Sequence, residues 1–207
     1  MDYLKVFVAL IALVNPLGIL PMFISLTHDF TKVQKKNAIR AASLTVVAVI
    51  VVCALLGEHI IKFFGISTAS LQVAGGLLIL LMSLSMLNAQ PSGAKTTAEE
   101  RDEAEHKDTI GVVPLGIPLL TGPGAMSTVI VLAGKSHHAS EYVALIGSGV
   151  VIAALVWLTL QMAEPIARVM GRTGINIATR IMGLLVAAVA VEFIVDGLVV
   201  MMPALGG

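Results

Sequence analysis

The sequence predicts an all-α integral membrane protein with six transmembrane helices, arranged as two inverted repeats of three helices each. Three observations lead to this prediction. The 207 residues are 57% hydrophobic and only 13% charged, which is far from the composition of a soluble domain. The apolar residues gather in six stretches, each near the length of about 20 residues that a helix needs to cross a bilayer. The two halves of the chain also resemble each other at a fixed offset.

Short polar connections separate the predicted spans, except in the middle of the chain. The spans cover approximately residues 4–27, 40–60, 68–89, 111–134, 142–163 and 180–202. Residues 90–110 form a long polar connection, where we expect a solvated loop or a short surface helix on the cytoplasmic side. This connection divides the chain into a first three-helix unit, residues 1–89, and a second, residues 111–207. The first apolar stretch runs on to Leu26 without a cleavage pattern, so we interpret it as an uncleaved span.

The internal repeat is visible at an offset of 106 residues. This offset places Gly18, Glu58 and Gly65 on Gly124, Glu164 and Gly171. One further residue places Gly76-Leu77-Leu78 on Gly183-Leu184-Leu185. An odd number of spans in each unit turns the second unit upside down, which gives an inverted-topology repeat.

The basic residues predict the orientation of the chain. Ten of them fall in the connections on one side: Lys32, Lys35, Lys36, Arg40, Lys95, Arg101, Lys107, Arg168, Arg172 and Arg180. Three fall on the other side: Lys5, Lys62 and Lys135. Cytoplasmic loops carry an excess of Lys and Arg, so we expect the first group in the cytoplasm and both termini outside.

Two short stretches should break the first and fourth spans near mid-membrane. They are Asn15-Pro16-Leu17-Gly18-Ile19-Leu20-Pro21 and Pro118-Leu119-Leu120-Thr121-Gly122-Pro123-Gly124. Proline removes a backbone donor and glycine lowers helix stability. Lipid cannot satisfy the backbone groups that a broken helix frees, so these groups must face protein, a cavity or a ligand. A break in each half of a chain is the sequence pointer to a transport site.

Both breaks have the residues of a helix start. Asn15-Pro16 pairs a good N-cap residue with the residue favoured at the first helical position, and Gly122-Pro123 follows the same pattern. The N-termini of two half-helices would bind a carboxylate without Arg or Lys, and the free carbonyls before them could hold an ammonium group or a coupling cation. The alternative is two kinked helices that merely pack closely. The candidate substrate-binding residues are Asn15, Pro16, Gly18, Thr121, Gly122, Pro123 and Gly124.

Several ionisable and polar residues within the spans are further candidates. Glu192 and Asp196 lie four residues apart on one face of the sixth span, and carboxyl groups at that depth usually line a cavity or a proton path. We assign them to proton coupling, the alternative being a shallower span with Asp196 at the interface. Glu58 and Glu164 are either solvated charges at helix ends or members of gating ion pairs, Glu58 with Lys62 and Glu164 with Arg168. The third span also carries hydrogen-bonding residues that either join helices or line a path: Gln72, Ser83, Ser85 and Asn88.

Three motifs together resemble a known family. They are N-P-L-G-I-L-P-M-F at 15–23, A-G-G-L-L at 74–78 and P-L-G-I-P-L-L-T-G-P-G-A-M-S-T at 114–128. The whole chain is similar to MarC-type proteins of the SnatA-like neutral amino-acid transporter family. This resemblance implies a bacterial or archaeal cytoplasmic-membrane protein that transports small neutral amino acids such as glycine and alanine, with protons as the favoured coupling ion. It also implies that the two break motifs form the substrate site.

The sequence excludes several other classes. It has no nucleotide-binding loop, metal-ligand spacing or protease arrangement, and we expect no enzyme activity, cofactor or metal. Net charge is zero without long basic runs, so we expect lipid rather than nucleic acid as a partner. The choice between protons and sodium stays open, as does a homo-oligomer, because Gly183 and Ala187 predict close helix packing within or between subunits. The alternatives to a coupled transporter are a stress-linked scaffold that carries no solute and a passive solute channel.

Overall fold

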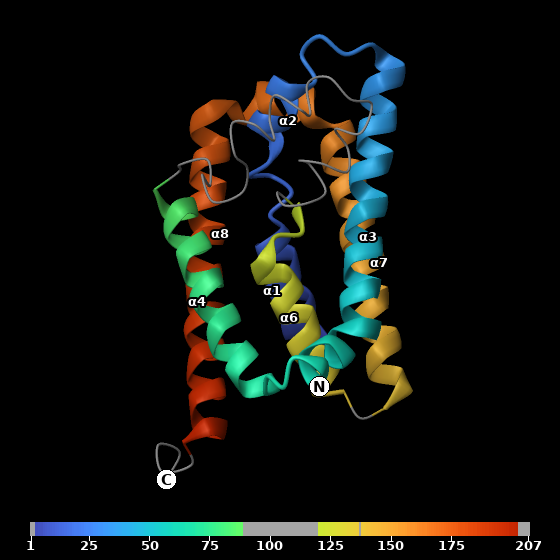
Figure 1. Cartoon of the computed structure of the whole chain (residues 1–207). Coiled ribbons are helices and arrows are strands. Elements are labelled where there is room, and N and C mark those ends of the chain that lie inside the picture. The colour runs from blue at the N-terminus through green and yellow to red at the C-terminus, as the bar shows by residue number, and fades with distance from the viewer. Residues whose placement is uncertain (1–2, 89–119, 137, 203–207) are drawn as a thin grey trace.

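The computed structural model describes residues 3–88, 120–136 and 138–202 of the chain. All regular structure in these residues is helical (Figure 1). The helices long and apolar enough to cross a membrane are α3 (Lys32–Phe63), α4 (Thr68–Leu87), α7 (Ala139–Gln161) and α8 (Ala163–Met201). The shorter helices are α1 (Tyr3–Val14), α2 (Leu20–Leu26) and α6 (Pro123–Gly134). This confirms an α-helical membrane protein, while the six-span inverted repeat stays a prediction.

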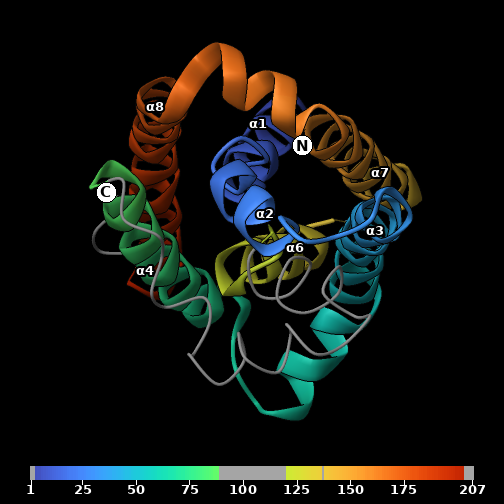
Figure 2. The same cartoon turned by 90° about the horizontal axis from the view of Figure 1, so that it is seen from above.

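The short helices lie inside a surround of long ones. Figure 2 shows α1, α2 and α6 near the middle, with α3, α4, α7 and α8 around them. The long helices form two contacting pairs, α3 with α7 and α4 with α8. Helix α6 packs against α3 and α4, whereas α1 packs against α6, α7 and α8. The largest fully buried side chains come from inner and outer helices alike: Leu10, Leu13, Leu20, Ile50, Ile79, Leu120, Leu145, Ile152, Leu160 and Gln72.

Helix α4 begins where its span was predicted to begin, whereas α3 begins earlier. Helix α4 begins at Thr68, as predicted, because the Ser67 hydroxyl caps it by accepting from the Ser70 N–H at 3.0 Å. Helix α3 begins at Lys32 rather than near residue 40. Thr31 and Gln34 form a capping box there, in which the Thr31 N–H donates to Gln34 Oε1 at 2.9 Å. The cap allows the helix to continue beyond its apolar part.

Helix α8 also begins well before its predicted span. The prediction placed the start near residue 180, but helical structure begins at Ala163 and bends at Gly171, which has φ 61° and ψ −179°. Seen from above, the first part of α8 runs across the end of the molecule before the helix turns downward (Figure 2). The starts of α3 and α8 lie at the end of the molecule opposite to the start of α1 and the end of α8 (Figure 1). The basic residues of these segments therefore divide between the two ends.

Helices α4 and α8 pack backbone against backbone. A β-carbon added at Gly76 of α4 would lie 3.0 Å from the Ala190 carbonyl oxygen of α8. A β-carbon at Gly183 of α8 would lie 3.1 Å from the Leu87 nitrogen, and one at Gly197 would lie 3.0 Å from the Ala69 carbonyl oxygen. The close packing expected at Gly183 is therefore confirmed, and it occurs within one chain.

Candidate functional site

The first predicted span is broken, as its prolines and glycine indicated. Helix α1 ends at Val14 and α2 begins at Leu20. Between them the Gly18 N–H donates to the Asn15 carbonyl at 3.1 Å and to the Asn15 side-chain oxygen at 3.2 Å. A β-carbon at Gly18 would collide with the Asn15 side-chain amide, so this turn favours glycine.

The prediction that Asn15 caps a helix and Pro16 opens it is wrong. Asn15 has φ 44°, and its N–H still donates to the Ile11 carbonyl at 2.9 Å, so it belongs to the end of α1. Helix α2 instead follows Ile19, which has helical dihedrals and no side-chain cap, and its early proline is Pro21. Asparagine tolerates left-handed backbone and also bonds nearby backbone groups. Here these properties serve the turn instead of the cap.

The second break has the geometry that the sequence predicts. Gly122 precedes α6 with extended backbone, φ −69° and ψ 175°, and Pro123 is the first residue of the helix. The first intrahelical bond runs from the Met126 N–H to the Gly122 carbonyl at 3.1 Å. The first amides of a helix have no partner within it, and proline has no N–H, so Gly124 and Ala125 carry the donors at this terminus. Thr121, Gly122 and Gly124 are buried, while Pro123 is exposed. The half-helix expected before this break lies outside the described residues.

Hydroxyl groups support the first turn of α6. Ser127 and Thr128 both donate to the Gly124 carbonyl, at 3.0 Å and 2.8 Å, and both side chains are buried. Their oxygens keep lone pairs that can accept a further hydrogen bond. The turn therefore offers backbone donors at its N-terminus and hydroxyl acceptors one turn later.

The structure brings the two breaks towards each other. Ala12 and Leu13 from the last turn of α1 pack in one apolar cluster with Ala125 from the first turn of α6. Ile79 of α4 and Ala190 of α8 close the same cluster. In Figure 1 the end of α1 and the start of α6 lie near half the height of the long helices. Both breaks therefore lie between the two ends of the molecule.

Glu192 and Asp196 do not join this cluster. Both side chains are exposed on α8, whereas Val186, Ala190 and Gly197 are buried against the other helices. Two residues along an α-helix correspond to about 200° of rotation, so Glu192 lies on nearly the opposite side of α8 from Ala190. A role in proton coupling stays a prediction. Within the described residues, no group of three His, Cys, Asp or Glu side chains could hold a metal ion.

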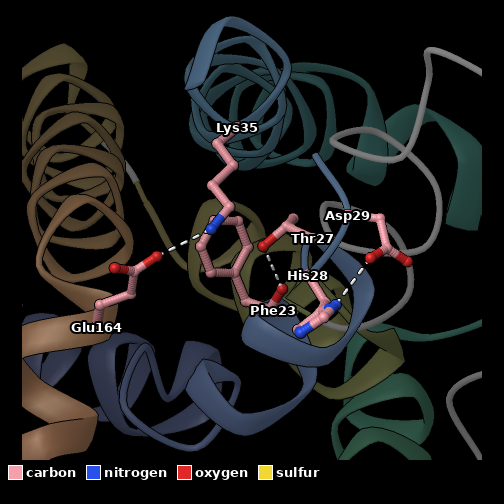
Figure 3. A network of polar contacts seen from close by, with 6 residues as sticks. All are labelled: Phe23, Thr27, His28, Asp29, Lys35 and Glu164. Carbon is pink, nitrogen blue, oxygen red and sulfur yellow. Dashed lines mark hydrogen bonds and ion pairs between the residues drawn. The ribbon is translucent and has the colours of Figure 1, made fainter. Parts of the chain in front are cut away.

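An ion pair that the sequence did not reveal joins α3 to α8. Lys35 Nζ lies 2.9 Å from Glu164 Oε1, although the two residues are 129 positions apart (Figure 3). The sequence suggested Arg168 as the partner of Glu164. The other suggested pair is confirmed, with Lys62 Nζ 2.6 Å from Glu58 Oε1 on the same helix.

The end of α2 lies beside the Lys35–Glu164 pair. Thr27 is buried, and its hydroxyl donates to the Phe23 carbonyl at 2.8 Å (Figure 3). His28 and Asp29 follow at the surface, with His28 Nδ1 2.8 Å from Asp29 Oδ1. The buried Phe23 ring fixes α2 in the core, so the short helix is held at the end where α3 and α8 are joined.

Comparisons with known proteins place this chain in a family. The family described as "MarC family integral membrane protein" matches residues 1–202. The UPF0056 membrane protein YhcE of Escherichia coli is 39% identical over 98% of this chain and 94% of its own length. The UPF0056 membrane protein MJ1677 of Methanocaldococcus jannaschii is 35% identical over 95% of both chains. YvbG of Bacillus subtilis, also a UPF0056 membrane protein, is 34% identical over 97% of this chain and 95% of its own. No solved structure matches significantly.

Proposed function

Because this chain belongs to the MarC family of integral membrane proteins, we propose that it is a secondary transporter of small neutral amino acids such as glycine and alanine. It acts in the bacterial cytoplasmic membrane with both termini outside, and a proton gradient drives it. The two three-helix units form inverted repeats, and the solute site opens alternately to each side.

The start of α6 is the observation that carries this proposal. A helix N-terminus presents free N–H groups and about half a positive charge, which together bind a carboxylate. Here that terminus lies in the interior, with Gly122 and Gly124 buried, and at mid-height in the molecule (Figure 1). Lipid cannot pair the N–H groups of this terminus, whereas the carboxylate of a zwitterion can.

The chemistry of the breaks favours a small, neutral solute. Neither break contains a Lys or Arg side chain, so neither break selects an anionic side chain by charge. A β-carbon at Gly124 would lie 3.0 Å from Ile79 Cγ1 and 3.1 Å from Met82 Sδ. The first turn of α6 is therefore closely packed against α4, which favours a small solute. Carbonyl groups of the broken helices would receive the ammonium group.

Transport of radiolabelled glycine and alanine into proteoliposomes tests the proposal. An inward proton gradient is imposed on the wild type, on Gly124→Val and on Glu192→Gln. Gly147→Val is the matched control, because a β-carbon at Gly147 would meet nothing within 4 Å. We expect gradient-driven uptake by the wild type and by Gly147→Val, and at least a tenfold loss in Gly124→Val, whose added side chain blocks the first turn of α6.

The outcomes separate the alternatives. A folded wild type that takes up neither amino acid would contradict the proposal and favour a scaffold. Uptake that persists when the proton gradient is collapsed and only the solute gradient is held would indicate a passive channel. Uptake by Glu192→Gln at the wild-type rate would place proton coupling on other residues.

A further inference from the structure

One buried amide in α4 has no partner. Gln72 is only 1% exposed, and its Nε2 group makes no hydrogen bond within the described part of the chain. Folded proteins pair nearly all buried polar groups, and an unpaired donor costs free energy because its hydration is lost. An amide kept in this position needs an acceptor that arrives from elsewhere.

Gln72 lies in a contact between α4 and α6 that begins at the second helix break. At one end of the contact, a β-carbon added at Gly124 of α6 would lie 3.0 Å from Ile79 Cγ1 of α4. At the other end, Gly134 faces the Thr68 methyl group at 3.4 Å. Gln72 falls between Thr68 and Ile79 on the buried side of α4. The amide therefore lies between the break and the end of the molecule where α4 begins (Figure 1).

Most residues on the facing sides of α4 and α6 are glycines or carry hydrogen-bonding side chains, and we call this contact the α4–α6 seam. It comprises Thr68, Gln72, Gly75 and Ile79 of α4 with Gly124, Ser127, Val131 and Gly134 of α6. A β-carbon at Gly75 would lie 2.5 Å from Ser127 Oγ, so the hydroxyl sits directly against the glycine backbone. The seam thus combines hydrogen-bonding side chains, three glycines and two apolar side chains.

The two partners of α4 hold it differently. At the contact between α4 and α8, a β-carbon added at Gly76, Gly183 or Gly197 would meet a side-chain atom at 2.7–2.9 Å and two backbone atoms at 3.0–3.2 Å. Against α6, the contacts of Gly75 and Gly124 are mainly with side chains. Side chains can change rotamer and backbone cannot, so α4 should move together with α8 and separate from α6.

We propose that the α4–α6 seam is the outer part of the solute path, and that the Gln72 amide donates to the solute carboxylate after it leaves the N-terminus of α6. This inference rests on the proposed function. In the closed seam the Gln72 amide is buried from water and unpaired. It donates to the solute carboxylate once the α4–α8 pair has moved away from α6.

Cysteine labelling tests the seam without relying on transport. Gln72→Cys is made on a Cys53→Ser background, since Cys53 is the only native cysteine. The probe is a charged, membrane-impermeant methanethiosulfonate added to proteoliposomes. Ala74→Cys is the control, because Ala74 lies at similar depth on the exposed side of α4. We expect Gln72→Cys to react at least tenfold faster than Ala74→Cys, and glycine or alanine to slow the reaction.

A second variant tests the contact with the solute. Gln72→Met replaces the amide by an apolar side chain of similar length, so we expect uptake to fall at least tenfold while the melting temperature stays the same or rises. A purely structural glutamine would give a lower melting temperature.

The two proposals fail in different ways. A protein that transports amino acids while Gln72→Cys stays unreactive would overturn the seam alone. A reactive Gln72→Cys that neither amino acid slows, in a wild type without uptake, would overturn the solute contact and the proposed function together. Uptake by Gln72→Met at the wild-type rate would overturn the role of the amide.

Discussion

The two helix breaks use their backbone groups in opposite ways. At the first break the chain closes on itself, because the Gly18 and Leu20 amides donate to Asn15 and Leu17. At the second break extended Gly122 leads directly into α6, whose first amides point away from the helix. Helix α2 has 7 residues, whereas α6 has 12. Similar motifs in sequence therefore give one self-contained turn and one helix N-terminus that extended backbone enters directly.

The scaffold around the breaks is more alike in the two halves. Gly65 and Gly171, related by the offset of 106 residues, have φ 66° and 61°. Helices α3 and α7 begin one residue further along the same offset, where the Thr31 and His138 amides donate to the Gln34 and Glu141 side chains at 2.9 Å and 3.4 Å. Among the described residues, the supporting helices keep the offset whereas the two breaks differ in geometry, so these differences lie at the candidate site.

The largest stability effect should come from filling the α4–α8 interface. Gly76 and Gly183 are equivalent at an offset of 107 residues, and each lies against backbone of the other helix. Gly76→Val and Gly183→Val should each lower the free energy of unfolding by about 1–3 kcal/mol, because neither neighbour can yield. Denaturation in mixed micelles measures this, with Gly147→Val as the control. Very unequal losses would break the equivalence of the halves.

A change at Asn15 should sharpen the contrast between the breaks. Asn15→Ala should cost about 1–2 kcal/mol, because alanine is disfavoured at φ 44° and the hydrogen bond to Gly18 is lost. Asn15→Gly should lower the free energy of unfolding by less, because glycine adopts a positive φ without steric strain. The same denaturation assay decides the point. If Asn15→Ala were as stable as wild type, the self-contained turn would not hold the first break.

The two glycines with positive φ, Gly65 and Gly171, should both resist substitution. A β-carbon at Gly65 or Gly171 would meet nothing within 4 Å, so only the backbone conformation opposes substitution. Gly65→Ala and Gly171→Ala should each lower the free energy of unfolding by at least about 1 kcal/mol. The asparagine variant should be no more stable than the alanine variant at Gly171, because ψ −179° lies outside the left-handed helical region that asparagine tolerates. Melting curves of the four variants check this. A loss confined to one position would show that the bend matters in one half alone.

The smallest stability effect should come from the ion pairs, which are exposed and weakly stabilising. Glu58→Gln and Glu164→Gln should melt close to wild type. Their effects on uptake should differ, because the Lys35–Glu164 pair joins α3 to α8 while the Glu58–Lys62 pair stays within α3. The exchange of Lys35→Glu with Glu164→Lys should restore uptake. Equal uptake in both single variants would contradict a role for the pair in the transport cycle.

The pattern of apolar residues predicts much of the fold. Hydropathy places α4 and α7 within a few residues, and Pro and Gly predict the breaks. The early start of α3 is missed because hydropathy reads only the part of a helix that lies in hydrocarbon. The capping box of Thr31 and Gln34 is nevertheless present in the sequence, and it would have given the start.

The sequence predicts the candidate site less well, because the conformations and contacts of its residues depend on tertiary structure. Asparagine favours both helix caps and left-handed turns, and the sequence does not decide which role Asn15 takes. The Lys35–Glu164 pair spans 129 positions, so local spacing pointed to Arg168 instead. Spacing placed Glu192 and Asp196 on one face of a helix, but it did not reveal that this face is exposed.

The shortness of α1 bears on how the chain enters the membrane. Twelve residues extend about 18 Å at 1.5 Å per residue, which is well below the hydrocarbon thickness of about 30 Å. Helix α1 packs mainly against α6, α7 and α8, which are synthesised last. Helix α1 therefore acquires these packing partners only after the later part of the chain has been synthesised. Truncation after α4 should leave this segment without its packing partners and expose the product to membrane proteases.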